Sequence, residues 1–180
     1  MLASMETKRQ RAYIVCGNAG VGKSTFAAQL CAEKAAVLID IDTVTERLAK
    51  LVLRGHGLPE DDRDSAAYKA LLREPVYEAL FDVALDNLPH LPCVIVGPFT
   101  RERREPSWPE RLAARLKTAI GIYVVWCSPE ERRRRIERRG NPRDGGKLVD
   151  FERYAAEGED AAAPPFAHHW VDTTRGVRFD

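Results

Sequence analysis

A glycine-rich segment near the start of the chain has the residue types that bind phosphate groups. It reads G-x-x-x-x-G-K-S-T, follows a short apolar run and precedes a helix-forming run. The glycines let the backbone turn tightly, so that successive N–H groups and the first turn of the helix can surround an anionic phosphate. In such a loop the lysine reaches the β- and γ-phosphates of a nucleotide, and the serine hydroxyl ligates Mg²⁺. The loop residues are Gly17, Asn18, Ala19, Gly20, Val21, Gly22, Lys23, Ser24 and Thr25.

Two acids stand two residues apart where the next apolar run ends. Residues 35–40 predict a strand that ends in Asp40-Ile41-Asp42. Side chains two apart on a strand leave on the same side, and parallel strands end at the edge of the sheet where the phosphate loop also lies. One acid can then hold the Mg²⁺ shell while the other accepts a proton from an attacking hydroxyl. The alternative is an acidic strand end that caps the next helix.

The third predicted strand, residues 92–97, is followed by arginines and by no acid at the position where a second magnesium-binding acid often stands. We therefore assign Mg²⁺ binding and the acceptance of the hydroxyl proton to the pair Asp40 and Asp42. Arg101 is the arginine closest to the strand end, and we expect it to contact an anionic or polar acceptor. Arg73, beside Tyr77 in the helical segment before this strand, is a further candidate for substrate binding. A solvated basic turn and a surface arginine are the respective alternatives.

Residues 129–139 predict an arginine-rich helix, because Ser128 can cap it, a proline and acids occupy its first turn, and Gly140 ends it. Arg135 and Arg139 are four apart and share one face. Such a pair can place one guanidinium over an adenine and the other on the phosphates. Arg143 can close from the other side of the following turn. The alternative is a solvated face, and neighbouring glutamates dilute the positive charge that a nucleic-acid surface would need.

These residues are positioned by strands that alternate with helices, which is typical of a parallel sheet covered on both faces. A long helical excursion separates the second strand from the third. In it, Thr43 is expected to cap a helix through Leu53, with Glu46 completing a capping box. Apolar spacing resumes from Tyr68 to Leu88. Further strands are predicted at 121–127 and 169–172, further helices at 109–119 and 150–158, and a mobile or sharply turned connection at 145–146.

Composition bounds the remaining interpretations. The 180 residues suit one domain, with 44% apolar residues, 31% charged residues and a formal net charge of +1. The apolar runs are too short to cross a bilayer, so we expect a cytoplasmic protein without a membrane partner. The four cysteines form no C-x-x-C pair and are interpreted as small buried side chains. The pair at 168–169 has no further ligands nearby, so no histidine metal site is predicted.

The motifs together resemble the nucleoside monophosphate kinase-like branch of P-loop kinases. The loop at 17–25 is similar to a Walker A loop, and the acid pair, the helical excursion and R-x-x-x-R follow in the family's order. This branch includes shikimate and gluconate kinases, chloramphenicol phosphotransferase, zeta toxins and polynucleotide 5′-kinases. The resemblance implies one α/β domain over 1–180 with a three-layer P-loop fold. Its five-stranded parallel sheet has the order 2-3-1-4-5, with a helical substrate-binding region at 43–91 and a lid at 138–150.

The resemblance also implies roles for individual residues. Asp42 corresponds to the acid that activates the substrate hydroxyl, and Asp40 and Ser24 to the Mg²⁺ site. Arg135 corresponds to the adenine-facing arginine and Arg139 to the catalytic, phosphate-facing one, acting with Lys23. The loop that contains Thr173 is expected to border the adenine.

The leading hypothesis is an ATP- and Mg²⁺-dependent kinase for a hydroxyl group of a small molecule. A kinase for the 5′-hydroxyl of a nucleic acid or for a nucleotide sugar is the second hypothesis. The third is an ATP-binding regulatory switch that makes no phosphorylated small product. A GTPase is not favoured, because the sequence lacks the guanine-recognition pattern N-K-x-D.

Overall fold

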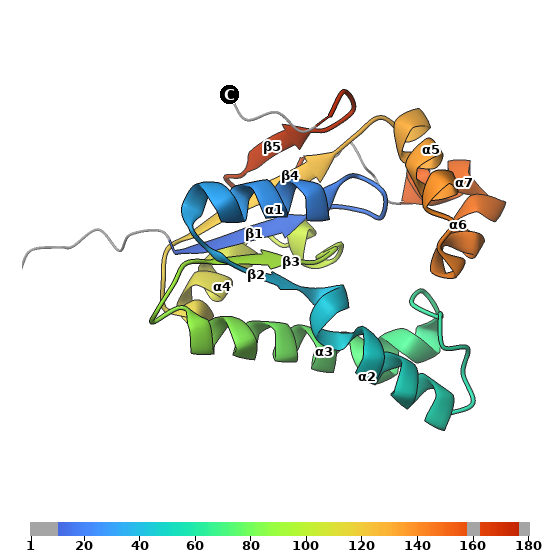
Figure 1. Cartoon of the computed structure of the whole chain (residues 1–180), viewed down its shortest axis with the longest axis horizontal. Coiled ribbons are helices and arrows are strands. Elements are labelled where there is room, and N and C mark those ends of the chain that lie inside the picture. Colours follow the sequence, from blue (N-terminus) through green and yellow to red (C-terminus); the bar gives the residue numbers. More distant parts are fainter. Residues whose placement is uncertain (1–10, 158–162, 177–180) are drawn as a thin grey trace, which may run out of the picture.

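The computed structural model describes residues 11–157 and 163–176, and its centre is one parallel sheet (Figure 1). The strand order is β2-β3-β1-β4-β5, which confirms the order predicted from the sequence. Ile14 of the central strand lies opposite Ile95 on one side and Ile122 on the other. All five strands therefore end at the same edge of the sheet. They are β1 (Ala12–Cys16), β2 (Val37–Asp40), β3 (Cys93–Val96), β4 (Ile120–Trp126) and β5 (His169–Asp172).

Helices cover both faces of the sheet and its carboxyl edge (Figure 1). One face carries α1 (Lys23–Lys34), and the other carries α3 (Ala66–Asn87) and α4 (Trp108–Leu116). The remaining helices gather beside the carboxyl ends of the strands and comprise α2 (Ile41–Gly55), α5 (Pro129–Arg139), α6 (Gly145–Val149) and α7 (Phe151–Glu157), with short 3-10 turns η1 (Glu102–Arg104) and η2 (Pro142–Asp144). No helix among the described residues is both long and apolar enough to span a membrane.

Side chains along β1 point alternately to the two faces of the sheet and so belong to two separate core layers. Ile14 is fully buried against the layer formed by α3 and α4, whereas Tyr13 and Val15 join the layer under α1. Successive side chains of a strand point to opposite faces, so a central strand covered on both faces has to be apolar throughout. A third cluster, which includes Leu53 and Leu72, packs α2 against α3. This contact joins the helical excursion to the sheet.

The second helix begins earlier than the sequence predicted. Asp40 is its N-cap and accepts a hydrogen bond from the amide of Asp42 over 2.9 Å. Thr43 lies inside the first turn, so the prediction that Thr43 caps this helix is wrong. The carboxylate at the strand end already satisfies an otherwise unpaired amide of the first turn, which removes the need for a later cap. Asp42 consequently stands on a helix and not on the strand.

The segment around residues 145–146 also differs from the prediction. Gly145 and Gly146 form the first turn of α6, where a mobile or sharply turned connection was expected. Gly145 has φ −53° and ψ −48°, so the chain passes from the turn η2 into α6 with helical backbone angles. No left-handed glycine is required at this position. The whole stretch from 142 to 149 is therefore ordered into two short helical pieces.

The loop after β3 is held by aromatic packing. Phe99 has a positive φ of 45°, which is unusual for a residue with a side chain. Its amide donates to the Tyr77 hydroxyl over 3.2 Å, and its ring lies 5.1 Å from that of Tyr77 and 5.3 Å from that of Trp108. These contacts fix the loop to α3 and α4. They hold Thr100 and Arg101, which line the cavity described below, at the carboxyl edge of the sheet.

Leu80→Ala is expected to lower the free energy of unfolding by about 2–5 kcal/mol, because it leaves a cavity under the sheet. Leu80 is fully buried, whereas Leu48 on α2 is 66% exposed. The matched substitution Leu48→Ala should change the free energy of unfolding by less than about 0.5 kcal/mol. Urea denaturation followed by circular dichroism measures both values. Equal losses in the two variants would contradict this assignment of the core.

Candidate active site

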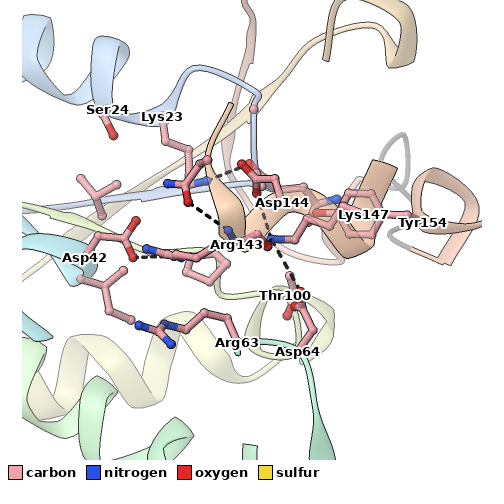
Figure 2. A pocket seen from close by; sticks show the side chains of 18 of the residues that line it. Lys23, Ser24, Asp42, Arg63, Asp64, Thr100, Arg143, Asp144, Lys147 and Tyr154 are labelled. Carbon is pink, nitrogen blue, oxygen red and sulfur yellow. Dashed lines mark hydrogen bonds and ion pairs between the residues drawn. The ribbon is translucent and has the colours of Figure 1, made fainter. Parts of the chain in front are cut away.

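A large cavity of about 1310 Å³ opens at the carboxyl edge of the sheet, and Figure 2 shows part of its lining. The volume exceeds the roughly 300–1,000 Å³ of a typical small-molecule site, so two ligands can bind side by side. Most of the site residues predicted from the sequence line this cavity; Gly17, Val21 and Thr173 do not. The lining residues among the predictions are Asn18, Ala19, Gly20, Gly22, Lys23, Ser24, Thr25, Asp40, Asp42, Arg73, Arg101, Arg135 and Arg139.

The phosphate loop packs so closely against its surroundings that two of its positions accept only glycine. A Cβ atom at Gly17 would lie 2.3 Å from the carbonyl oxygen of Val125, and one at Gly20 would lie 2.8 Å from Ile136. Both glycines have positive φ values, 143° and 83°. The helix α1 starts directly after this loop, and no side chain caps its first turn. Its free amides are therefore available to an anion at the helix N-terminus.

Lys23 extends from the first position of α1 and donates to the carbonyl oxygen of Asn18 over 2.8 Å. Burial lowers the pKa of Lys23 to about 8, although Asp42 and Asp40 act in the opposite direction. The side chain of Asn18 accepts from Arg103 over 3.4 Å, and Arg103 is itself buried. Arg103 thus holds the phosphate loop through its hydrogen bond to the Asn18 side chain. The sequence placed it in an arginine cluster but contained no signal for this contact.

Ser24 and Asp40 form the pair predicted to hold a metal ion. The Ser24 hydroxyl donates to Asp40 Oδ2 over 3.4 Å, while Asp40 Oδ1 caps α2. In the described part of the chain no three histidine, cysteine or acidic side chains gather into a metal site. Mg²⁺ commonly takes only one or two protein oxygens and completes its shell with phosphates and water. A hydroxyl and one carboxylate beside the phosphate loop fit such an ion.

Asp42 takes part in an ion-pair network that crosses the cavity (Figure 2). Arg143 donates to Asp42 Oδ1 and to Glu46 Oε2, each over 3.0 Å. Glu46 also accepts from Arg63 over 2.9 Å. Burial lowers the pKa of Arg143, but the charges of Asp42 and Glu46 outweigh this effect and raise it. Glu46 was absent from the predicted site, although its place one turn after Asp42 on the same helical face was a usable signal.

The predicted lid segment folds over the cavity through a buried acid. Asp144 accepts from Arg139 Nε over 3.1 Å and from Lys147 over 3.2 Å, and Lys147 also lies 3.6 Å from Asp64 in the helical excursion. Asp144 is buried, with 2% of its surface exposed. Arg139 is therefore bonded within the lid in the ligand-free protein. Its contact with phosphates stays a prediction.

Arg135 joins three parts of the site. Its guanidinium donates to the carbonyl oxygen of Val21 over 3.3 Å, and to the hydroxyl and carbonyl oxygens of Thr173 over 2.9 and 2.6 Å. Its Nε pairs with Glu131 over 2.7 Å. The Thr173 hydroxyl in turn donates to Val21 over 2.6 Å. Arg135 thereby fastens the end of β5 to the phosphate loop, and its predicted place over an adenine remains untested.

The two predicted acceptor arginines differ in how firmly they are held. Arg73 makes two parallel hydrogen bonds to Glu102, of 2.8 and 3.0 Å, and its guanidinium lies 5.0 Å from the ring centre of Tyr77. This bidentate geometry fixes the arginine plane. The Arg101 side chain is 78% exposed, and its Nε lies 3.8 Å from Glu105. Arg101 is thus held by fewer contacts than Arg73.

Lys23→Met is expected to raise the free energy of unfolding at pH 7 by about 1–3 kcal/mol, because it removes a half-buried, partly desolvated charge. The pKa of Lys23 is about 8 in the folded protein, below its ordinary 10.5. The penalty is therefore full below pH 8, decreases from pH 8 to 10.5 and is absent above that range. Urea titrations should show the advantage of the variant disappearing between pH 7 and pH 10.5. A pH-independent difference would contradict this assignment. Lys34→Met, at the other end of α1, is the control.

Glu46→Gln is expected to loosen the lid, because Arg143 and Arg63 lose a shared anionic partner. Amide hydrogen exchange of residues 140–149 should become several-fold faster in the ligand-free protein. Glu74→Gln, an exposed position on α3 outside the cavity, provides the matched control. Unchanged exchange in Glu46→Gln would show that the network does not hold the lid.

Comparisons with known proteins agree with this geometry. A family model described as an AAA domain, AAA_33, matches residues 13–164. A shikimate kinase from Bacteroides thetaiotaomicron superposes with a TM-score of 0.59 at 20% identity, over 89% of this chain and 85% of that one. A sugar kinase from a Janibacter species gives 0.57 at 14% identity, over 91% and 85%.

A third similar structure, described as the Pnkp1/Rnl/Hen1 RNA repair complex, gives a TM-score of 0.52 at 20% identity, over 87% of this chain and 48% of that one. No curated protein sequence matches the chain with significance. The family model nevertheless covers most of the chain, and its residues include the phosphate loop, the acid pair and the lid. The chain therefore belongs to the AAA_33 family and has the fold of the nucleoside monophosphate kinase-like P-loop kinases.

Proposed function

We propose that this protein transfers the γ-phosphate of ATP to a hydroxyl group of a small molecule. One observation carries the proposal: Asp42 lines the same cavity as the phosphate loop, with Ser24 and Asp40 hydrogen-bonded between them. A donor site and a proton acceptor thus share one space. Similarity to a shikimate kinase and a sugar kinase supports a hydroxyl acceptor, as far as a common fold can.

Each residue of the proposed site has a separate task. Lys23 and the amides of the loop hold the phosphates, and Arg139 neutralises charge on the transferring group once it turns from Asp144. Asp42 orients the acceptor hydroxyl and accepts its proton. Mg²⁺, bound by Ser24 and Asp40, would neutralise charge on the β- and γ-phosphates. Arg143 donates to Oδ1 of Asp42, so Oδ2 is the oxygen that accepts the acceptor hydroxyl.

A polynucleotide 5′-hydroxyl kinase is the second candidate. The arginines at 101–104 and 132–139 favour it, as does the similarity to the RNA repair complex. Binding of a single-stranded oligonucleotide that weakens steeply with salt would support this candidate. An ATP-dependent switch is a third one, and it predicts a nucleotide-dependent protein partner. Detection of a phosphorylated small product would decide against the switch.

The test of the proposed function is ATP turnover with a panel of sugars, cyclitols, nucleosides and hydroxylated antibiotics. Mass spectrometry should detect an acceptor that has gained one phosphoryl group, together with ADP in equal amount. Hydrolysis of ATP without a phosphorylated acceptor in any reaction, together with a nucleotide-dependent partner, would contradict the proposal.

Asp42→Asn is expected to lower kcat for the acceptor about 10²–10⁴-fold, because an amide cannot accept the hydroxyl proton. The KM for ATP should stay within about twofold, since Asp42 does not hold the phosphates. Asp86→Asn, an exposed acid on α3 outside the cavity, is the matched control. If Asp42→Asn left the transferase rate intact, the assignment of Asp42 as the base would fail.

A further inference from the structure

The residues that line the cavity carry a larger net positive charge than the protein as a whole. Twelve of its lining residues are lysine or arginine and six are aspartate or glutamate, an excess of six positive charges. The whole chain has a formal net charge of only +1. A concave site lined by one sign of charge focuses the field and attracts oppositely charged ligands. ATP with its magnesium ion carries fewer negative charges than this excess, so positive charge remains for the second ligand.

Part of the excess lies on the wall formed by α3 and η1. Lys69 and Arg73 are four residues apart on α3, and both line the cavity. Arg73 is bonded to Glu102 of η1, which brings Arg101 and Arg104 to the same wall. Within the described residues, the Lys69 side chain makes no hydrogen bond or ion pair, whereas its backbone amide donates to the carbonyl oxygen of Ser65. We call Lys69, Arg101 and Arg104 the acceptor-side cations.

The same wall continues to the proposed base. Tyr68 precedes Lys69 on α3, and the Arg63 guanidinium lies 5.3 Å from the centre of the Tyr68 ring. Arg63 donates to Glu46, and Arg143 donates to both Glu46 and Asp42. Tyr77, which also lines the cavity, lies 5.0 Å from the guanidinium of Arg73. A path of neighbouring groups thus leads from Asp42 past the two tyrosines to the acceptor-side cations.

We propose that the acceptor carries a carboxylate or a phosphate ester, which binds the acceptor-side cations while its hydroxyl lies at Asp42. The inference rests on the proposed phosphotransferase function. In the reaction, the acceptor oxygen forms a bond to the γ-phosphorus as the bond to the β-phosphate oxygen breaks. The hydroxyl proton passes to Asp42, and ADP leaves. The anionic group of the acceptor takes no part in bond making and serves to orient the molecule.

The test compares acceptors that differ in charge at one group: gluconate with sorbitol, shikimate with its methyl ester, and adenosine 3′-monophosphate with adenosine. We expect the charged member of at least one pair to have a kcat/KM at least about tenfold higher, since hydrogen bonds between charged groups are the stronger ones. Lys69→Gln and Arg101→Gln should each raise the KM for that acceptor several-fold to about tenfold, with kcat and the KM for ATP unchanged.

Control variants distinguish recognition of the acceptor from an effect on folding and from the loss of a positive charge elsewhere on the protein. Lys69→Arg should restore the KM, because it returns the positive charge. Arg47→Gln removes one charge from an exposed position on α2 outside the cavity and should leave every constant unchanged. Thermal unfolding of each variant establishes that it folds. Lys69 and Arg101 are exposed, so their replacement removes no core contact.

The possible results distinguish this inference from the function on which it rests. Equal turnover of charged and neutral members, with no effect of Lys69→Gln, would overturn the anionic acceptor and leave the kinase proposal standing. Absence of any phosphorylated product from every acceptor would overturn both. Faster phosphorylation of a 5′-hydroxyl oligonucleotide than of all small acceptors would overturn the small-molecule acceptor and support the polynucleotide candidate.

Discussion

Close contact between the phosphate loop and its neighbours is the constraint on which the rest of the site depends. Backbone from β4 and a side chain of α5 occupy the space that side chains at Gly17 and Gly20 would need. The loop is thus curved by its packing before any ligand arrives, and α1 begins with uncapped amides. A pre-formed anion site of this kind costs little reorganisation on binding. The other charged side chains that line the cavity share one space with this anion site.

Acids of the protein hold the cations of this site. Desolvation lowers the pKa of the half-buried Lys23, and Arg139 and Arg143 are each bonded to an acid of the protein. Burying unpaired charge is unfavourable, so these pairs stabilise the cations that line the cavity. An anion that binds Arg139 or Arg143 replaces one acidic partner by another.

The two halves of the cavity differ in how strongly the fold determines them. The donor half is built from the sheet edge, β1 and α1, where the phosphate loop directly joins the strand to the helix. The acceptor half is built from α2, α3 and the loop after β3, where Phe99 is held at a positive φ by Tyr77 and Trp108. The acceptor half thus depends on contacts between helices and a loop, whereas the donor half follows from one strand–loop–helix unit.

The sequence alone was sufficient for the phosphate loop, the acid pair and the alternation of strands with helices, because these follow from local periodicity and from short motifs with fixed spacing. The strand order was predicted through the resemblance to a known family, and the structure confirms it. It misplaced the start of α2, since only the folded strand end shows that Asp40 caps the helix. It also overlooked Glu46, Arg103 and Asp144 as parts of the site. Glu46 and Arg103 have partners in distant segments, with Glu46 and Arg143 97 positions apart and Asn18 and Arg103 85 apart. Asp144 has local partners, Arg139 and Lys147, and its burial is decided by the packing of the whole segment. Contacts between distant segments are decided by packing in three dimensions, and no local pattern in the chain encodes them.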